Sequence, residues 1–260
     1  MELWLTDRVR LGMLLSACAL LASIELLVPL FRYRRGRLRR ALPNVVLAVG
    51  VVLANLALAS LTASLSAFLV RHKIGLLSGM RSQPWLLAAV GVAALDLFSY
   101  IAHFLLHKML LGWRFHRVHH SELEVDVTTA FRQHPGETLW RASWQFLGIV
   151  VFGLPLWTVP LYLSLSSLNA LLEHANVRVS DRFDRGLRLL IVTPNMHKIH
   201  HSRVIKETDS NYANIFSIWD RIFGTYAARK NYQNLRYGLD GFDDKKAQTL
   251  ISLLRLPFRS

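Results

Sequence analysis

The chain has 260 residues, of which 52% are hydrophobic and 18% charged, and its formal net charge is +14. Its apolar residues occur in long runs, which is typical of membrane-spanning helices and argues against an ordinary soluble domain. A charge this positive can indicate nucleic-acid binding, but six of the arginines lie directly between two apolar runs, where positive charge fixes membrane topology. We therefore expect no nucleic-acid partner. Those arginines are Arg32, Arg34, Arg35, Arg37, Arg39 and Arg40.

The apolar runs predict three membrane crossings, at residues 11–31, 41–70 and 85–111. No small-residue cleavage site follows the first run, so we expect a retained span and not a removed signal peptide. The arginine-rich loop should be cytoplasmic, which places the amino terminus and the connection at 71–83 outside. The single cysteine, Cys18, excludes an internal disulfide or a thiolate zinc site from this chain alone.

The third apolar run carries four polar residues on one helical stripe. They are Asp96, Tyr100, His103 and His107, at i, i+4, i+7 and i+11. Such a stripe turns toward the interior of a helix bundle, because polar groups facing lipid cost several kcal/mol. Histidines at i and i+4 present two imidazoles to one point, a common way for a helix to hold a metal ion. Tyr100 is expected either to steer a substrate or to satisfy a ligand.

A polar stretch follows at 112–137 and contains an H-x-x-H-H triplet at positions 116, 119 and 120. The next apolar stretch, 138–172, is too short for two crossings and is interrupted by Gly153, Pro155 and Pro160. We expect a short helical hairpin that returns to its starting side. That return places His174 and a second H-x-x-H-H triplet, at 197, 200 and 201, on the same face as the first triplet.

From residue 178 onward the chain is polar and is expected to be cytoplasmic, with a short helix around 211–226 and an interfacial helix around 249–258. The expected fold class is all-α, an integral membrane helical bundle of about three full spans plus a short helical hairpin, with a cytoplasmic histidine-rich cap. We divide the chain into N-terminal spans with a basic loop at 1–83, a catalytic domain at 84–230 and a cytoplasmic or interfacial tail at 231–260.

The two triplets and the pair in the third run supply eight histidines, more than one metal ion uses. Packing does not explain them well, because buried imidazoles need hydrogen-bond partners in a region that is poor in them. We therefore predict two metal ions. Imidazole suits iron, zinc, copper and nickel, so the ligand type excludes calcium and magnesium without choosing among the others.

Five stretches of the chain, in order, closely resemble the fatty acid hydroxylase and sterol desaturase superfamily of membrane di-iron oxygenases. They are WRFHRVHHS at 113–121, TAFRQHPGE at 129–137, LEHANV at 172–177, TPNMHKIHHSR at 193–203 and NYANIFSIWDRIFGTY at 211–226. The resemblance implies a cytoplasmic, all-histidine dimetal site that uses dioxygen and two electrons to hydroxylate or desaturate an aliphatic carbon of a lipid. Many relatives have an arginine directly after the first histidine, where this chain has Phe104, which weakens assignment to a subgroup.

Carried over position by position, the resemblance implies eight histidine ligands, with His174 as a ninth. His134 is a further candidate ligand, although Pro135 can instead fix a turn with the imidazole beside the site. The eight ligands are His103, His107, His116, His119, His120, His197, His200 and His201.

Metal-bound imidazoles usually donate their second N–H to a carboxylate or a carbonyl. The acidic residues placed to accept such a bond are Asp96, Glu137, Asp209 and Asp220. For Asp209 and Asp220 a helix cap or a solvated loop is the alternative, and Asn176 either holds a metal-bound water or caps a helix. We take as candidate catalytic residues Asp96, Tyr100, Asn176 and Asp220.

The resulting hypothesis is a lipid C–H oxygenase with two iron ions, or zinc in their place, that acts on a membrane lipid or sterol-like substrate with O2. No haem, flavin or nicotinamide motif occurs, so electrons should come from a partner such as a ferredoxin, a cytochrome or a reductase. Two alternatives stay open: a non-enzymatic membrane metal transporter or sensor, and zinc-dependent lipid chemistry without redox change. We expect a bacterial inner membrane, with the endoplasmic reticulum as the alternative.

Overall fold

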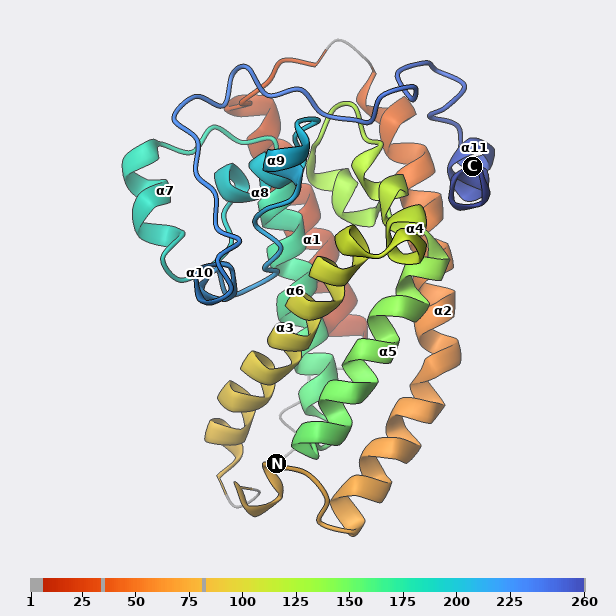
Figure 1. Cartoon of the computed structure of the whole chain (residues 1–260), viewed down its shortest axis with the longest axis vertical. Helices are drawn as coiled ribbons and strands as arrows, with labels where there is room; N and C mark the ends of the chain where they lie inside the picture. Colours follow the sequence, from red (N-terminus) through yellow and green to blue (C-terminus); the bar gives the residue numbers. More distant parts are fainter. Residues whose placement is uncertain (1–6, 34–35, 81–82, 260) are drawn as a thin grey trace.

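The computed structural model describes residues 7–33, 36–80 and 83–259. Across these residues the regular elements are all helices, and β-type pairing is limited to three isolated bridges. The molecule is elongated: long helices run along its length, and short helices and loops gather at one end, which we call the cap (residues 110–134 and 175–259; Figure 1). The predicted all-α fold class is confirmed.

Three helices are long and apolar enough to cross a membrane, namely α1 (Asp7–Leu27), α2 (Arg37–Arg71) and α3 (Pro84–Lys108). At about 1.5 Å per residue, each reaches the thickness of a bilayer core of about 30 Å. The surface of α2 is largely exposed and apolar, with Leu53 and Leu61 among its exposed side chains, as expected of a helix that faces lipid. Half of α3 is buried, so α3 lies inside the bundle.

The predicted hairpin is formed by α5 (Pro135–Phe152) and α6 (Thr158–His174), and it returns to the cap as expected. Its turn is made by Gly153 in the left-handed region, with φ +65°. The tip contacts the connection between α2 and α3, because the amides of Leu76 and Leu77 donate to the carbonyls of Val151 and Phe152 at 3.0 Å. The hairpin therefore extends to the end of the bundle that lies opposite the cap.

The interior of the bundle is built around α3, which packs against both helices of the hairpin. Leu87 and Leu95 of α3 share a buried apolar cluster with Ile149 of α5 and Tyr162 of α6. The hairpin thus encloses the lower part of α3 and leaves its last two turns, which carry the histidine pair, to meet the cap (Figure 1).

The cap consists of short elements joined by loops. They are α4 (Leu110–His120), η2 (Val127–Phe131), α7 (Asp181–Leu187), α8 (Pro194–His200), α9 (Ile205–Thr208), α10 (Ile218–Ile222), α11 (Leu250–Arg255) and η3 (Leu256–Phe258), while η1 (Ser78–Met80) lies between α2 and α3. The helix expected around 211–226 is limited to α10. Leu253 and Leu256, near the end of the chain, pack against Leu47 of α2 and Val118 of α4.

The arginine-rich connection between α1 and α2 lies at the same end of the molecule as the cap. Arg40 donates to Asp126 at 2.8 Å, and the amide of Leu30 donates to the carbonyl of Asn176 at 3.1 Å. Glu25 of α1 accepts from the amides of Val127 and Asn176, at 2.7 and 2.8 Å. These bonds fix the first span to the cap.

Candidate metal centre

Nine buried or partly buried histidines converge in two adjacent groups where α3, α4, α6 and α8 meet. Within each group the ligand atoms all lie within 4.8 Å of one another. The first group comprises His103, His107, His116, His120 and His200, and the second comprises His119, His174, His197 and His201. Each group has enough nitrogens for one metal ion, which matches the expectation of two ions.

The ring nitrogens inside each group approach one another closely. In the first group the Nε2 atom of His116 lies 3.0 Å from that of His103 and 3.2 Å from that of His120. In the second group the Nε2 atoms of His174 and His197 are 3.0 Å apart. Among the described residues, the buried Nε2 atom of His200 has no hydrogen-bond partner.

The donor set fits a divalent transition metal. Burial lowers the pKa of the histidines in α4 and around α8, so these rings are neutral near pH 7 and offer lone pairs. Lone pairs aimed at one point are satisfied together by a cation bound among them, and neutral imidazole is the form that binds metal. The histidines with lowered pKa values are His116, His119, His120, His197, His200 and His201.

Five of the nine rings are fixed through their second nitrogen, Nδ1. Four of these nitrogens contact backbone carbonyls and one contacts a carboxylate. An Nδ1–H that donates to such an acceptor holds the ring in one orientation and leaves Nε2 free for a metal. The pairs are His103 with the Tyr212 carbonyl (2.8 Å), His116 with Glu137 Oε1 (2.9 Å), His119 with the Arg132 carbonyl (3.2 Å), His174 with the Ala170 carbonyl (2.7 Å) and His200 with the Ser210 carbonyl (2.7 Å).

The model of the fatty acid hydroxylase family matches residues 88–225, more than half of the chain. The chain belongs to the fatty acid hydroxylase family. The resemblance found in the histidine motifs is therefore confirmed, and the two histidine groups lie within the matched region.

Three proteins that are similar to this chain illustrate the breadth of the family. Ornithine lipid hydroxylase OlsE of Rhizobium tropici is 28% identical over 253 residues, which cover 94% of this chain and 74% of the relative. Alkylglycerol monooxygenase of Danio rerio is 33% identical over 60% of this chain, but the match spans only 32% of the relative. Methylsterol monooxygenase 1 of Gallus gallus is 31% identical over 54% of this chain and 48% of the relative. No solved structure matches the chain.

Two of the four acidic residues predicted to support ligands lie beside a histidine. Glu137 contacts His116 and is itself held by Arg141 at 2.8 Å. Asp209 Oδ1 lies 3.7 Å from His107 Nδ1, and its other oxygen pairs with Lys108 at 2.7 Å. The neighbouring His107 imidazole and Lys108 ammonium lower the pKa of Asp209, so it is ionised at neutral pH.

The hydrogen bonds of Asp96 lead to a later segment of the chain and not to a histidine ring. Its buried carboxylate accepts hydrogen bonds from the amides of Ile215 and Phe216, at 3.1 and 2.9 Å, and from the indole N–H of Trp219 at 3.0 Å. Asp96 thus anchors the segment 215–219 against α3. It supports the site indirectly, because the same segment continues back to Tyr212, whose carbonyl fixes His103.

The other candidate catalytic residues also make structural bonds. Asp220 accepts from the amides of Tyr212 and Ala213, at 2.7 and 3.0 Å, and Tyr100 bonds to the Thr225 hydroxyl at 2.9 Å. The amide of Asn176 pairs with both backbone groups of Phe31, at 3.0 and 2.8 Å. Within the described part of the chain, none of Asp96, Tyr100, Asn176 and Asp220 bonds to a histidine ring.

His134 belongs to neither histidine group. Its Nδ1 accepts from the amide of Gly136 at 2.9 Å and so caps the start of α5, while its Nε2 lies 3.3 Å from the Leu254 carbonyl. This geometry corresponds to the alternative in which Pro135 fixes a turn beside the site.

One carboxylate beside the histidines was not anticipated from the sequence. Glu173 is buried, and its Oε1 lies 3.8 Å from His197 Nε2 and 3.8 Å from His174 Nδ1. Asn169 donates to its other oxygen at 3.3 Å. The only signal in the sequence is that Glu173 directly precedes a histidine, and adjacent residues on a helix do not share a face.

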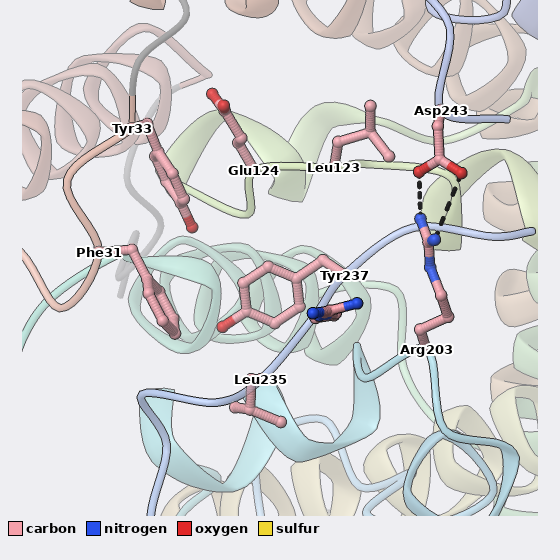
Figure 2. Close-up of a pocket in the computed structure, with 9 residues that line it drawn as sticks. Phe31, Tyr33, Leu123, Glu124, Arg203, Leu235, Tyr237 and Asp243 are labelled. Atoms are coloured by element: carbon pink, nitrogen blue, oxygen red, sulfur yellow. Dashed lines mark hydrogen bonds and ion pairs between the residues drawn. The ribbon is translucent and has the colours of Figure 1, made fainter.

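A separate pocket of about 450 Å³ lies on the cap, and its walls contain none of the nine clustered histidines (Figure 2). Phe31 and Tyr33, from the connection between α1 and α2, face Tyr237 across it, and an ion pair between Arg203 and Asp243 closes one side. The full set of lining residues is Phe31, Tyr33, Leu123, Glu124, Arg203, Leu235, Arg236, Tyr237 and Asp243.

Proposed function

We propose that this chain is a membrane di-iron oxygenase that hydroxylates, or desaturates, an aliphatic carbon of a lipid or sterol-like substrate with O2 and two electrons. The observation that carries the proposal is the pair of all-histidine groups within the matched family region. The names of the relatives, which refer to an ornithine lipid, alkylglycerols and a methylsterol, support a substrate with a long or fused hydrocarbon part.

The nine clustered histidines would hold the two ions, five in one group and four in the other. Iron bound there would supply the reduction of dioxygen and the removal of hydrogen from an unactivated carbon. The protein contributes orientation: Glu137 and the four backbone carbonyls keep Nε2 of their histidine partners directed at the ions. It also excludes water, because nearly all of the ligand side chains are buried.

We place the metal centre on the cytoplasmic side, because the arginine-rich connection is at the same end of the molecule as the cap. A bacterial inner membrane is the proposed location. Electrons would come from a soluble partner such as a ferredoxin, a cytochrome or a reductase, and the net positive charge of the chain would steer an acidic donor to the cap.

The proposal is tested by mass spectrometry of lipids from membranes with and without the chain. The expected result is a lipid that gains the mass of one oxygen, or loses that of two hydrogens, only when the intact chain and O2 are present. A matched control carries His119→Ala and His120→Ala, which removes one ligand from each group. Unchanged lipids with iron-loaded protein, reductant and O2 would contradict the proposal.

The arrangement of the histidines argues against a metal transporter, since a transport path needs ligands distributed across the bilayer. Here all nine lie together at the cap end of the bundle. Zinc-dependent chemistry without redox change is distinguished by metal analysis after anaerobic purification, which is expected to give about two equivalents of iron per chain.

A further inference from the structure

One flank of the cap exposes a continuous set of large apolar side chains, which we call the α7–α10 flank. It comprises Phe183, Leu189, Leu190, Ile218, Ile222 and Phe223, with exposed fractions between 49% and 70%. The two contributing segments are joined, because the amide of Ser217 donates to the Leu190 carbonyl at 3.3 Å and that of Val192 to the Ile215 carbonyl at 2.9 Å. Figure 1 shows α7 and α10 next to each other at the edge of the cap.

The depth of this flank is set by its contacts with α3. Trp219 of α10 donates to Asp96, which lies midway between Pro84 and Lys108 and therefore about 18 Å from either end of a helix long enough to span. The ring of Phe223 stacks on Tyr100 at 5.1 Å, one helical turn further toward the cap. Since a bilayer core is about 30 Å thick, α10 lies beside the part of α3 that is within or next to the hydrocarbon.

The charges of the flank complement an anionic lipid surface. Arg178, Arg182 and Arg185 are exposed beside its apolar residues, and Asp181 is the one exposed acidic residue of α7. A fourth arginine, Arg188, pairs with the buried carboxylate of Asp184 at 3.2 Å. Basic residues next to exposed apolar ones at the level of the headgroups are typical of segments that lie in a membrane interface.

A groove of about 540 Å³ on the flank has the same mixed character. It is lined by Ser180, Arg182, Phe183, Gly186, Leu187 and Leu190. Its lining residues are apolar or glycine apart from Ser180 and Arg182. This combination fits the upper part of an acyl chain, with a phosphate at the guanidinium.

We infer that the α7–α10 flank is inserted into the lipid leaflet on the cap side, with the arginines of α7 bound to anionic headgroups. The membrane is the occupant that the contacts favour, because α10 packs against the middle part of a helix long enough to span the bilayer. The region from residue 178 onward, expected from its polarity to be cytoplasmic throughout, is therefore partly seated in the bilayer. The inference concerns the seating of the cap and does not depend on the proposed activity.

Insertion is tested with nitroxide labels in nanodiscs that contain phosphatidylglycerol. The only native cysteine is removed by Cys18→Ser, and labels are placed by Phe183→Cys or Ile222→Cys. The matched control is Ile205→Cys, because Ile205 of α9 is equally apolar and 76% exposed but lies higher on the cap (Figure 1).

We expect labels at 183 and 222 to collide more often with O2 than with a water-soluble nickel complex, and the reverse at 205. Equal exposure of all three labels to the nickel complex would overturn the inference. So would protection at 183 and 222 that requires a second copy of the chain or an added electron-transfer protein, since the occupant would then be a protein.

The headgroup contact is tested by native mass spectrometry of bound phosphatidylglycerol. Combining Arg182→Gln with Arg185→Gln should weaken its binding by about fivefold per arginine, which corresponds to about 1 kcal/mol for each basic residue at a membrane surface. The control combines Arg236→Gln and Lys245→Gln, two exposed basic residues of the tail, and should leave binding unchanged. Equal effects of the two double variants would overturn the assignment of the headgroups to α7.

Discussion

Each H-x-x-H-H triplet divides its histidines between the two metal groups. His116 and His120 belong to the first group and His119 to the second, whereas His197 and His201 belong to the second group and His200 to the first. In both triplets the residues at i and i+4 go together and the residue at i+3 goes to the other group. On a helix with 3.6 residues per turn, positions i+3 and i+4 lie about 100° apart, so one short helix can serve both ions.

This division predicts different losses from neighbouring substitutions. His120→Ala combined with His200→Ala leaves three rings in the first group and should remove its ion while the second group keeps its own. His201→Ala leaves three rings in the second group and should do the opposite. Metal content per chain, measured after each variant is loaded with iron, should fall from about two equivalents to about one. If either variant kept both equivalents, or lost both, the two groups would not be separate sites.

His134 caps α5 and lies outside both groups. His134→Ala should retain both metal equivalents and lower the free energy of unfolding by about 1 kcal/mol, the usual cost of losing a helix N-cap. Metal analysis and a thermal melt measure the two effects. Loss of a metal equivalent would instead identify His134 as a ligand.

At the scale of elements, the histidine groups depend on a hairpin held at both ends. Its cap end supplies Glu137 and His174, while its tip is fixed to the connection between α2 and α3. The tip is tightly packed: a Cβ added to Gly153 would lie 2.0 Å from the Ile74 carbonyl oxygen. Close backbone approach and a positive φ both require glycine at this position.

Gly153→Ala is therefore expected to lower the melting temperature far more than Gly241→Ala. Both glycines have positive φ, but a Cβ on Gly241 meets nothing within 4 Å. Gly241→Ala, the control, should cost only the strain of an alanine at positive φ, on the order of 1–2 kcal/mol. Gly153→Ala adds to this strain a steric clash with neighbouring backbone atoms. Thermal unfolding of the two variants in the same detergent measures the difference, and equal melting temperatures would show that the tip contact is not needed.

At the scale of the whole molecule, burial of many neutral imidazoles makes the metal-free protein sensitive to acid. The six clustered histidines of α4 and of the segment 197–201 have folded pKa values below the unfolded value of about 6.5. Below that pH the unfolded chain takes up protons that the folded chain does not, so stability is present above about pH 6.5 and is lost as the pH falls.

We expect the melting temperature of metal-free protein to be clearly lower at pH 5.5 than at pH 8. The change in melting temperature between pH 5.5 and pH 8 reflects the titration of histidines more than that of carboxylates, because most carboxylates titrate below this range. Differential scanning calorimetry of the protein in detergent measures it, with the variant His119→Ala and His120→Ala as a control that should show a smaller drop. A melting temperature independent of pH in this range would contradict the burial of neutral rings.

Much of the fold and of the site could be predicted from the sequence, because it depends on local spacing. Apolar runs of twenty or more residues indicated the three spans, and Gly153 and Pro155 marked the turn of the hairpin. The i and i+4 spacing of His103 and His107 placed both rings on one helical face. Glu137 is one of the four acidic residues predicted to accept from a ligand, and in the structure it contacts His116.

The tertiary structure alone decided which side chains from different helices meet. Asp96 shares a helical stripe with His103, yet its carboxylate bonds to backbone amides more than a hundred residues later in the chain. Asn176 lies two residues after a clustered histidine but pairs with Phe31. The spacing of residues on one helix fixes the direction in which each side chain points, whereas the group it meets depends on how distant helices pack. The histidine motifs thus determined the chemistry of the centre, and the packing of α3, α4, α6 and α8 determined its two groups and their supports.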